Sequence, residues 1–191
     1  MLSGKGFKKV YNLSGGIKAW NSETAVGSQD LGIHLFAGNE TAEETIVVGF
    51  GLEQGLREFY LEMADKVDTK DARDLITKLA DIEILHQEHL HRLYMEVTGK
   101  TLSIQDLKSQ IVEPAMEGGL TTSDYMKLYQ PDLESTEDIL GLAMAIEAQA
   151  LDLYQRAADR SKNESVTSVL QQIASEERAH IARLAKYIDT M

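Results

Sequence analysis

Apolar residues recur in alternating steps of three and four positions along four long segments of the chain. This spacing keeps one face of an α-helix apolar and is typical of helices packed into a bundle. The four segments cover approximately residues 42–68, 70–98, 135–160 and 163–189. Because short turns join the first segment to the second and the third to the fourth, the pattern predicts two antiparallel helical hairpins.

Capping signals and one long connection define how these helices are arranged. Thr41 followed by Glu44 has the spacing of a capping box, which predicts the start of the first helix. Ser135, followed by acidic residues, predicts the start of the third helix. A connection as long as 99–134 can cross the full length of a bundle. We therefore expect an all-α four-helix bundle over residues 41–191, with this segment as the crossover.

The two predicted hairpins are related by a repeat with an offset of 94 residues. Each hairpin carries a lone glutamate and, 30 residues later, a Glu-x-x-His motif. The repeat relates Glu53 to Glu147, Tyr60 to Tyr154, Glu83 to Glu177 and His86 to His180. Hairpins related in this way can pack about a pseudo-twofold axis, so that their polar residues meet at the centre.

The repeated glutamates and histidines occupy helix positions that core packing would normally give to leucine. Four buried carboxylates are costly unless opposite charges compensate them, and no lysine or arginine shares these positions. Two divalent cations would balance four carboxylates and two neutral imidazoles. The pattern therefore predicts a di-metal site with the ligands Glu53, Glu83, His86, Glu147, Glu177 and His180. The alternative is an ordinary polar layer of protonated glutamates or ion pairs.

A second Glu-x-x-His spacing, Glu88 to His91, competes for the same helix. The repeat argues against it, because the equivalent positions in the other hairpin are Ala182 and Ala185. We expect His89 and His91 to be surface residues, and His34 to be structural or solvated.

Tyr60 and Tyr154 lie seven residues after the lone glutamates, on the same helix face. One interpretation is core packing with a satisfied hydroxyl group. The other is a catalytic role, as a hydrogen-bond donor to a ligand carboxylate or as a local electron donor.

The amino-acid composition excludes several classes of function. The chain has 191 residues and a formal net charge of -12, which argues against nucleic acid as a partner. It contains no cysteine, so a thiolate nucleophile, an iron–sulfur cluster and cysteine-ligated zinc are excluded. No apolar run is long enough to span a membrane or to act as a signal region. We expect a cytoplasmic protein without membrane contact.

Three helical segments resemble the rubrerythrin-like branch of the ferritin superfamily: 53–60, 146–154 and 175–180. The resemblance covers about residues 42–189. It implies a ferritin-like fold and a non-haem di-iron centre that reacts with hydrogen peroxide or dioxygen, and it suggests a homodimer. Ala150 departs from the family, in which another ligand glutamate stands at that position, so the expected site is symmetric. The family's cysteine-ligated electron-donor module is also missing, which implies a separate electron-donor protein.

The glycine-rich segment before the bundle has a different resemblance. Residues 6–20 are similar to the last strand and helix start of a rhodanese domain, whose catalytic cysteine would lie upstream. We expect residues 1–40 to be a remnant of such a domain. An ordinary glycine-rich leader is the alternative.

The donor set indicates the metal and the chemistry. Carboxylate oxygens with one imidazole per ion suit iron(II), with manganese(II) as the alternative. Glu83 and Glu177 are expected to bridge the two ions, whereas Glu53 and Glu147 are terminal. The leading hypothesis is a di-iron oxidoreductase that reduces peroxide or dioxygen. The alternatives are a ferroxidase that handles iron and a non-enzymatic dimerisation or sensing module of a rhodanese fusion.

Overall fold

The structure, a computed structural model, describes residues 32–111 and 120–188. Four long helices dominate it: α2 (Ala42–Ala64), α3 (Lys70–Thr98), α6 (Thr136–Arg160) and α7 (Glu164–Ile188). No strand occurs within the described ranges, and the predicted all-α bundle is confirmed. The rhodanese-like segment 6–20 lies outside the described residues, so the remnant proposed for residues 1–40 stays a prediction.

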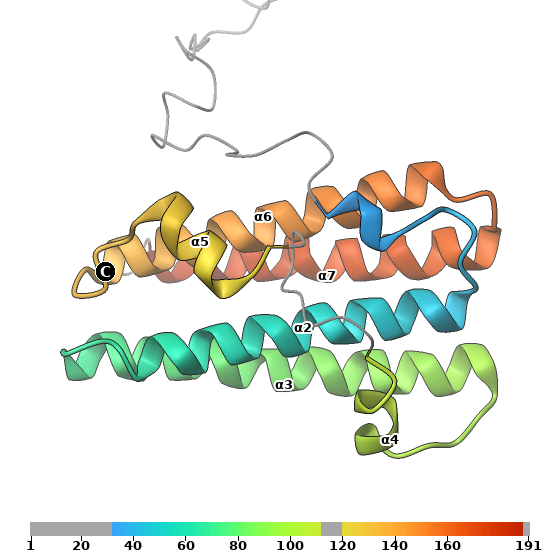
Figure 1. The fold of residues 1–191 in the computed structure, drawn as a ribbon, viewed down its shortest axis with the longest axis horizontal. Coiled ribbons are helices and arrows are strands. Elements are labelled where there is room, and N and C mark those ends of the chain that lie inside the picture. The colour runs from blue at the N-terminus through green and yellow to red at the C-terminus, as the bar shows by residue number, and fades with distance from the viewer. Residues whose placement is uncertain (1–31, 112–119, 189–191) are drawn as a thin grey trace, which may run out of the picture.

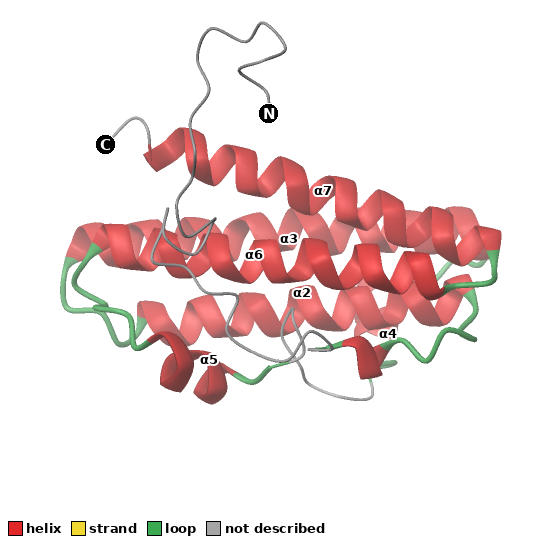
Figure 2. Ribbon diagram, turned by 90° about the horizontal axis from the view of Figure 1, so that it is seen from above, coloured by secondary structure: helices red, strands yellow, loops and turns green. Residues whose placement is uncertain are grey.

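The helices form the two predicted antiparallel hairpins (Figures 1 and 2). Helix α2 packs along α3 and α6 packs along α7, and the two hairpins lie side by side. The connection between them contains α4 (Ile104–Lys108) and α5 (Thr122–Tyr129), which lie toward opposite ends of the bundle. A short 3₁₀ helix, η2 (Ile33–Leu35), contacts α6. Among the described helices, none is both long and apolar enough to cross a lipid bilayer.

The predicted helix starts are confirmed by hydrogen bonds. The Thr41 hydroxyl oxygen accepts from the Glu44 backbone N–H at 3.2 Å, and the Glu44 carboxylate accepts from the Thr41 backbone N–H at 2.7 Å. These two bonds form a capping box. The Ser135 hydroxyl oxygen accepts from the Asp138 backbone N–H at 3.2 Å and caps α6.

The first helix is shorter than the predicted 42–68, because α2 ends at Ala64. Arg73 on the next helix satisfies the carbonyl groups released there. Its guanidinium donates to the Ala64 carbonyl oxygen at 3.2 Å and to the Val67 carbonyl oxygen at 2.8 Å. The turn still buries the Val67 side chain, which is 2% exposed. Two carbonyl oxygens at the end of α2 and in the following turn thus find their hydrogen-bond donor on α3, and no local sequence signal marks Ala64 as the last residue of the helix.

The steps of three and four that run from Ile76 through Leu90 to Val97 predict Val97 on the inward face of α3, but its side chain is 38% exposed. Three heptads separate it from Ile76, which is fully buried. A straight α-helix drifts by about 20° per heptad relative to a 3.5-residue repeat. The accumulated rotation of about 60° carries Val97 away from the core.

The apolar core consists of two clusters separated along the bundle. One includes Ile46, Leu90, Leu153 and Ile173. The other includes Leu56, Ile76, Leu140 and Leu184. On each long helix, the glutamates and histidines of the repeat fall between the two clusters in sequence. The helices therefore present a polar layer in the middle of an otherwise apolar core.

Replacing Thr41 by alanine should destabilise the chain by about 1 kcal/mol, because the side-chain half of the capping box is lost. Urea unfolding followed by circular dichroism measures this change. Ser168→Ala, at an exposed site inside α7, is the control and should alter stability by less than about 0.5 kcal/mol. Equal effects of the two substitutions would show that the cap does not stabilise α2.

Candidate metal centre

The structure brings together all six residues that the repeat singled out. Their exposed fractions are 7% or less, so the whole group is buried. They form two groups whose candidate ligand atoms lie within 4.8 Å of one another: Glu53, Glu83 and His86, and Glu147, Glu177 and His180. Each group combines a lone glutamate from the first helix of a hairpin with the Glu-x-x-His motif of the second.

In the first group, His86 faces both carboxylates. Its Nδ1 atom lies 2.7 Å from Glu83 Oε2 and 3.2 Å from Glu53 Oε2. Glu83 and His86 are three residues apart on α3, so one helical turn places them on the same face. Glu53 reaches them from α2. A single nitrogen atom and two carboxylate oxygens therefore converge on one small volume.

The second group repeats this arrangement on α6 and α7. His180 Nδ1 lies 3.2 Å from Glu177 Oε2 and 3.4 Å from Glu147 Oε2. The same nitrogen atom of the imidazole thus faces the carboxylates in both halves. The internal repeat of the sequence therefore gives two ligand groups of similar geometry.

The two groups adjoin at their histidines. The imidazole rings of His86 and His180 are stacked, with centroids 3.6 Å apart and an angle of 5° between the ring planes. Two fully protonated imidazoles would repel each other at this distance. The contact therefore favours a state in which at least one ring is neutral, as a metal ligand must be.

Burial and hydrogen bonding shift the pKa values of the first group in different directions. Burial raises the pKa of Glu83 well above its usual value, against the hydrogen bond from His86. Burial also opposes ionisation of Glu53, but its hydrogen bond with His86 and the positive charge of that ring lower its pKa. Burial disfavours a charged His86, yet hydrogen bonds to Glu53 and Glu83 raise its pKa to about 10. Without metal, a proton on His86 thus provides part of the charge compensation.

The donor set fits two divalent cations. Four carboxylates and two imidazoles are buried, and within the described residues no lysine or arginine forms an ion pair with any of them. Two polar atoms of the group, Glu147 Oε2 and His86 Nε2, are buried without a hydrogen-bond partner in the described part of the chain. Oxygen and imidazole donors suit iron(II) or manganese(II). Each group could hold one ion.

Comparison with known protein families gives a match to the C-terminal part of the chain. The family model described as Rubrerythrin matches residues 138–191, which span most of the α6–α7 hairpin. No curated protein and no solved structure matches the chain. The matched hairpin carries Glu147, Glu177 and His180. This likeness supports a metal-binding centre of the di-iron type, and the internal repeat extends the argument to the first hairpin.

The two tyrosines of the repeat lie on opposite sides of the ligand layer. Tyr60 is 1% exposed in one apolar cluster, and Tyr154 is fully buried in the other. The Tyr154 hydroxyl lies 3.9 Å from the position that a Cβ atom on Gly49 would occupy, so it reaches α2 one turn before Glu53. Both side chains thus flank the centre. Their catalytic role stays a prediction.

Two of the remaining histidines are less exposed than expected. His89 is half-buried, and its Nδ1 lies 3.1 Å from a Glu176 carboxylate oxygen on α7. His91 Nε2 lies 2.7 Å from the Leu102 carbonyl oxygen in the connection after α3. Contacts with a facing helix and with the crossover cover these rings, and periodicity along α3 alone cannot reveal such contacts. His34 is exposed, as expected.

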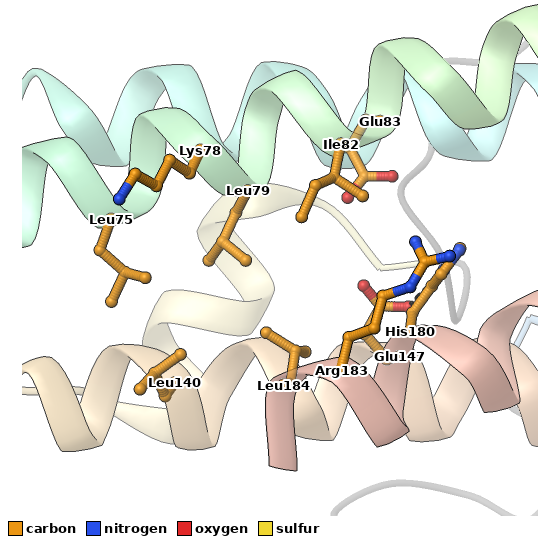
Figure 3. A pocket seen from close by; sticks show the side chains of 10 residues that line it. All are labelled: Leu75, Lys78, Leu79, Ile82, Glu83, Leu140, Glu147, His180, Arg183 and Leu184. Atoms are coloured by element: carbon orange, nitrogen blue, oxygen red, sulfur yellow. Dashed lines mark ion pairs between the residues drawn. The ribbon is translucent and has the colours of Figure 1, made fainter. Parts of the chain in front are cut away.

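Three charged residues near the centre were missed by the sequence argument. Partial burial raises the pKa of Glu176, the neighbour of Glu177. Lys78 and Arg183 line a cavity of about 220 Å³ that reaches the candidate ligands Glu83, Glu147 and His180 (Figure 3). No spacing in the sequence predicts this cavity, because it depends on the separation of α3 from α6 and α7.

Metal binding should release protons, because a ligand imidazole must be neutral and metal-free His86 has a pKa of about 10. The apparent affinity for a divalent cation should therefore rise with pH from 6 to 9, by about tenfold per pH unit for each proton released. Calorimetric titration in two buffers with different ionisation enthalpies measures the released protons. A pH-independent affinity without proton release would contradict the site geometry.

Replacing Glu83 by glutamine should weaken metal binding at least about tenfold, because it removes a ligand charge while keeping the side-chain shape. The same change should stabilise the metal-free chain near neutral pH, because burial raises the pKa of Glu83 and ionisation of this carboxyl group therefore opposes folding there. Anaerobic iron(II) titration and urea unfolding measure the two effects. Glu88→Gln is the matched control on the exposed face of α3 and should leave both quantities unchanged. Equal behaviour of the two variants would remove Glu83 from the site.

Proposed function

We propose that this chain is a non-haem di-iron oxidoreductase of rubrerythrin-like type, which reduces hydrogen peroxide or dioxygen. The observation that carries the proposal is the burial of two Glu/Glu/His groups that meet at stacked imidazoles in the bundle core. The Rubrerythrin match over residues 138–191 supports iron as the metal. Manganese(II) would suit the same donors and is the alternative ion.

Each side chain has a defined task in this proposal. One ion would be held by each group, with Glu83 and Glu177 as bridging ligands and Glu53 and Glu147 as terminal ligands. Two iron(II) ions, when bound, would supply two electrons, so that one hydrogen peroxide and two protons become two water molecules. The apolar clusters on both sides exclude water, which strengthens the electrostatic interactions inside.

The protein side chains contribute to the mechanism mainly by holding charged and polar groups in fixed positions around the ions. His86 and His180 each present Nδ1 toward two carboxylates, and helix packing fixes both rings. Tyr60 and Tyr154 flank the centre and are proposed as hydrogen-bond donors to ligand carboxylates or as local electron donors. Helices are rigid supports, so the six ligands need little rearrangement to receive the ions.

The same proposal includes the partners of the protein and its cellular location. The chain has no cysteine with which to bind its own iron–sulfur or rubredoxin-type donor, so a separate protein would supply electrons. We propose a cytoplasmic homodimer, without nucleic acid or membrane as a partner. The net charge of -12 supports the exclusion of nucleic acid.

Anaerobic loading with iron(II), followed by a stoichiometric addition of hydrogen peroxide, should oxidise two iron ions per peroxide consumed. Stopped-flow absorption and a residual iron(II) assay measure the rate and the ratio. Glu177→Gln should slow the reaction by at least about tenfold, because it removes a proposed bridging ligand. Iron that stays bound but is not oxidised would exclude the enzyme. Continued turnover of excess iron(II) into a mineral would instead favour a ferroxidase.

A further inference from the structure

An apolar cavity of about 220 Å³ lies between α3, α6 and α7 beside the candidate metal centre (Figure 3). Aliphatic side chains form most of its wall: Leu75, Leu79, Ile82, Leu140 and Leu184. Glu83, Glu147 and His180 line it as well, and they come from both ligand groups. The cavity is therefore continuous with the place where the proposed chemistry occurs.

The two cationic side chains of the wall lie at opposite ends of the cavity (Figure 3). The Arg183 guanidinium lies beside His180 and Glu147, whereas the Lys78 ammonium lies at the far end, toward Leu75. The wall between the two cations is aliphatic. The end at the ligand groups thus combines metal-binding donors with a guanidinium group, and the cavity extends from there between apolar side chains.

The internal repeat shows that this wall differs between the two halves of the chain. The offset of 94 residues relates Ile82 to Glu176 and Arg183 to His89. Glu176 and His89 form a close polar pair, with 3.1 Å between a carboxylate oxygen and Nδ1. On the cavity side isoleucine stands in place of the acid, and within the described residues Arg183 forms no ion pair and no hydrogen bond. An apolar side chain and an unpaired cation therefore line the cavity where the other half has a polar contact.

The wall and the size of the cavity do not match hydrogen peroxide. A small polar molecule needs several hydrogen-bond partners, and aliphatic side chains supply none. An apolar cavity of about 150 Å³ admits benzene, so this one has room for roughly nine carbon atoms. A molecule that fills it must be largely apolar, and its polar atoms must lie at the ligand end.

We propose that the substrate of the centre is an organic hydroperoxide whose apolar group fills this cavity. The apolar group would lie among the aliphatic side chains, and the hydroperoxide group would lie beside Arg183 and the ligand groups, where few polar side chains fix its orientation. This inference deepens the proposed function and rests on it for the redox step, whereas binding of the apolar group does not depend on it.

The proposed reaction is a two-electron cleavage of the O–O bond. The hydroperoxide would take one electron from each of two iron(II) ions, which become iron(III), and two protons from solvent. Its O–O bond would break to give one alcohol and one water molecule. Arg183 would donate hydrogen bonds to the oxygen atoms as negative charge develops on them. The alcohol keeps the apolar group, so it should bind in the same cavity.

Substrate choice is measured by stopped-flow oxidation of the iron(II)-loaded chain with cumene hydroperoxide or with hydrogen peroxide. Leu79→Trp should fill the cavity and slow the reaction with cumene hydroperoxide at least about tenfold, while the reaction with hydrogen peroxide changes less than about twofold. Leu85→Trp, at a position 59% exposed on α3 and outside the cavity, is the matched control and should alter neither rate. Equal slowing of both reactions by Leu79→Trp, or no reaction of the unaltered chain with cumene hydroperoxide alone, would overturn the proposal.

Binding is measured apart from the redox step with 2-phenyl-2-propanol, the alcohol formed from cumene hydroperoxide. It is titrated by calorimetry into the full-length chain, both metal-free and loaded with redox-inert zinc(II), and one molecule should bind per chain. Ile82→Glu alters a half-buried position, so it is a second variant if Leu79→Trp does not fold. It should weaken binding at least about fivefold, because a carboxylate replaces part of the apolar wall. Ile84→Glu, outside the cavity on the same helix, is the matched control and should leave binding unchanged.

The outcome is distinguishable from that of the proposed function. Binding of the alcohol with the expected variant pattern, in a chain whose iron no peroxide oxidises, would retain the cavity as an apolar binding site and reject the oxidoreductase. Iron oxidation by hydrogen peroxide without binding of the alcohol would retain the oxidoreductase and reject this inference. Binding that neither Leu79→Trp nor Ile82→Glu weakens would place the alcohol elsewhere and also reject it.

Discussion

The structure depends on one electrostatic constraint, which is the burial of four carboxylates and two imidazoles between two apolar clusters. An uncompensated buried charge costs several kcal/mol, and here the charges lie within a few ångströms of one another. The raised pKa values of Glu83 and His86 show how protons can compensate in the absence of metal. Two divalent cations would replace these protons and would balance the four carboxylates.

The internal repeat explains how a chain of this size builds such a site. Each hairpin supplies half of the ligands, and packing of the hairpins brings the halves together at the His86–His180 stack. The halves are similar rather than identical. His86 contacts its two carboxylates at 2.7 and 3.2 Å, whereas the corresponding distances for His180 are 3.2 and 3.4 Å. The cavity adds a further asymmetry, because it reaches one member of the first group but two of the second.

Much of this arrangement follows from the sequence, because helix periodicity, capping boxes and the repeat are local or regular signals. The hairpins, the caps at Thr41 and Ser135, and the shared face of the six polar residues could all be predicted in this way. Features that depend on a facing helix could not. Arg73 on α3 donates hydrogen bonds to carbonyl groups at the end of α2, and His89 pairs with Glu176 across helices. The cavity depends on how far α3 lies from α7. Val97 was misplaced because an idealised heptad ignores helical drift.

Bound cations would compensate the charges of this buried polar layer. Elemental analysis of the chain purified without oxygen tests it most directly, with urea unfolding before and after removal of metal by a chelator. We expect two iron ions per chain and a clear loss of stability when they are removed. A metal-free chain with unchanged stability, which takes up no iron(II) when it is offered, would contradict it.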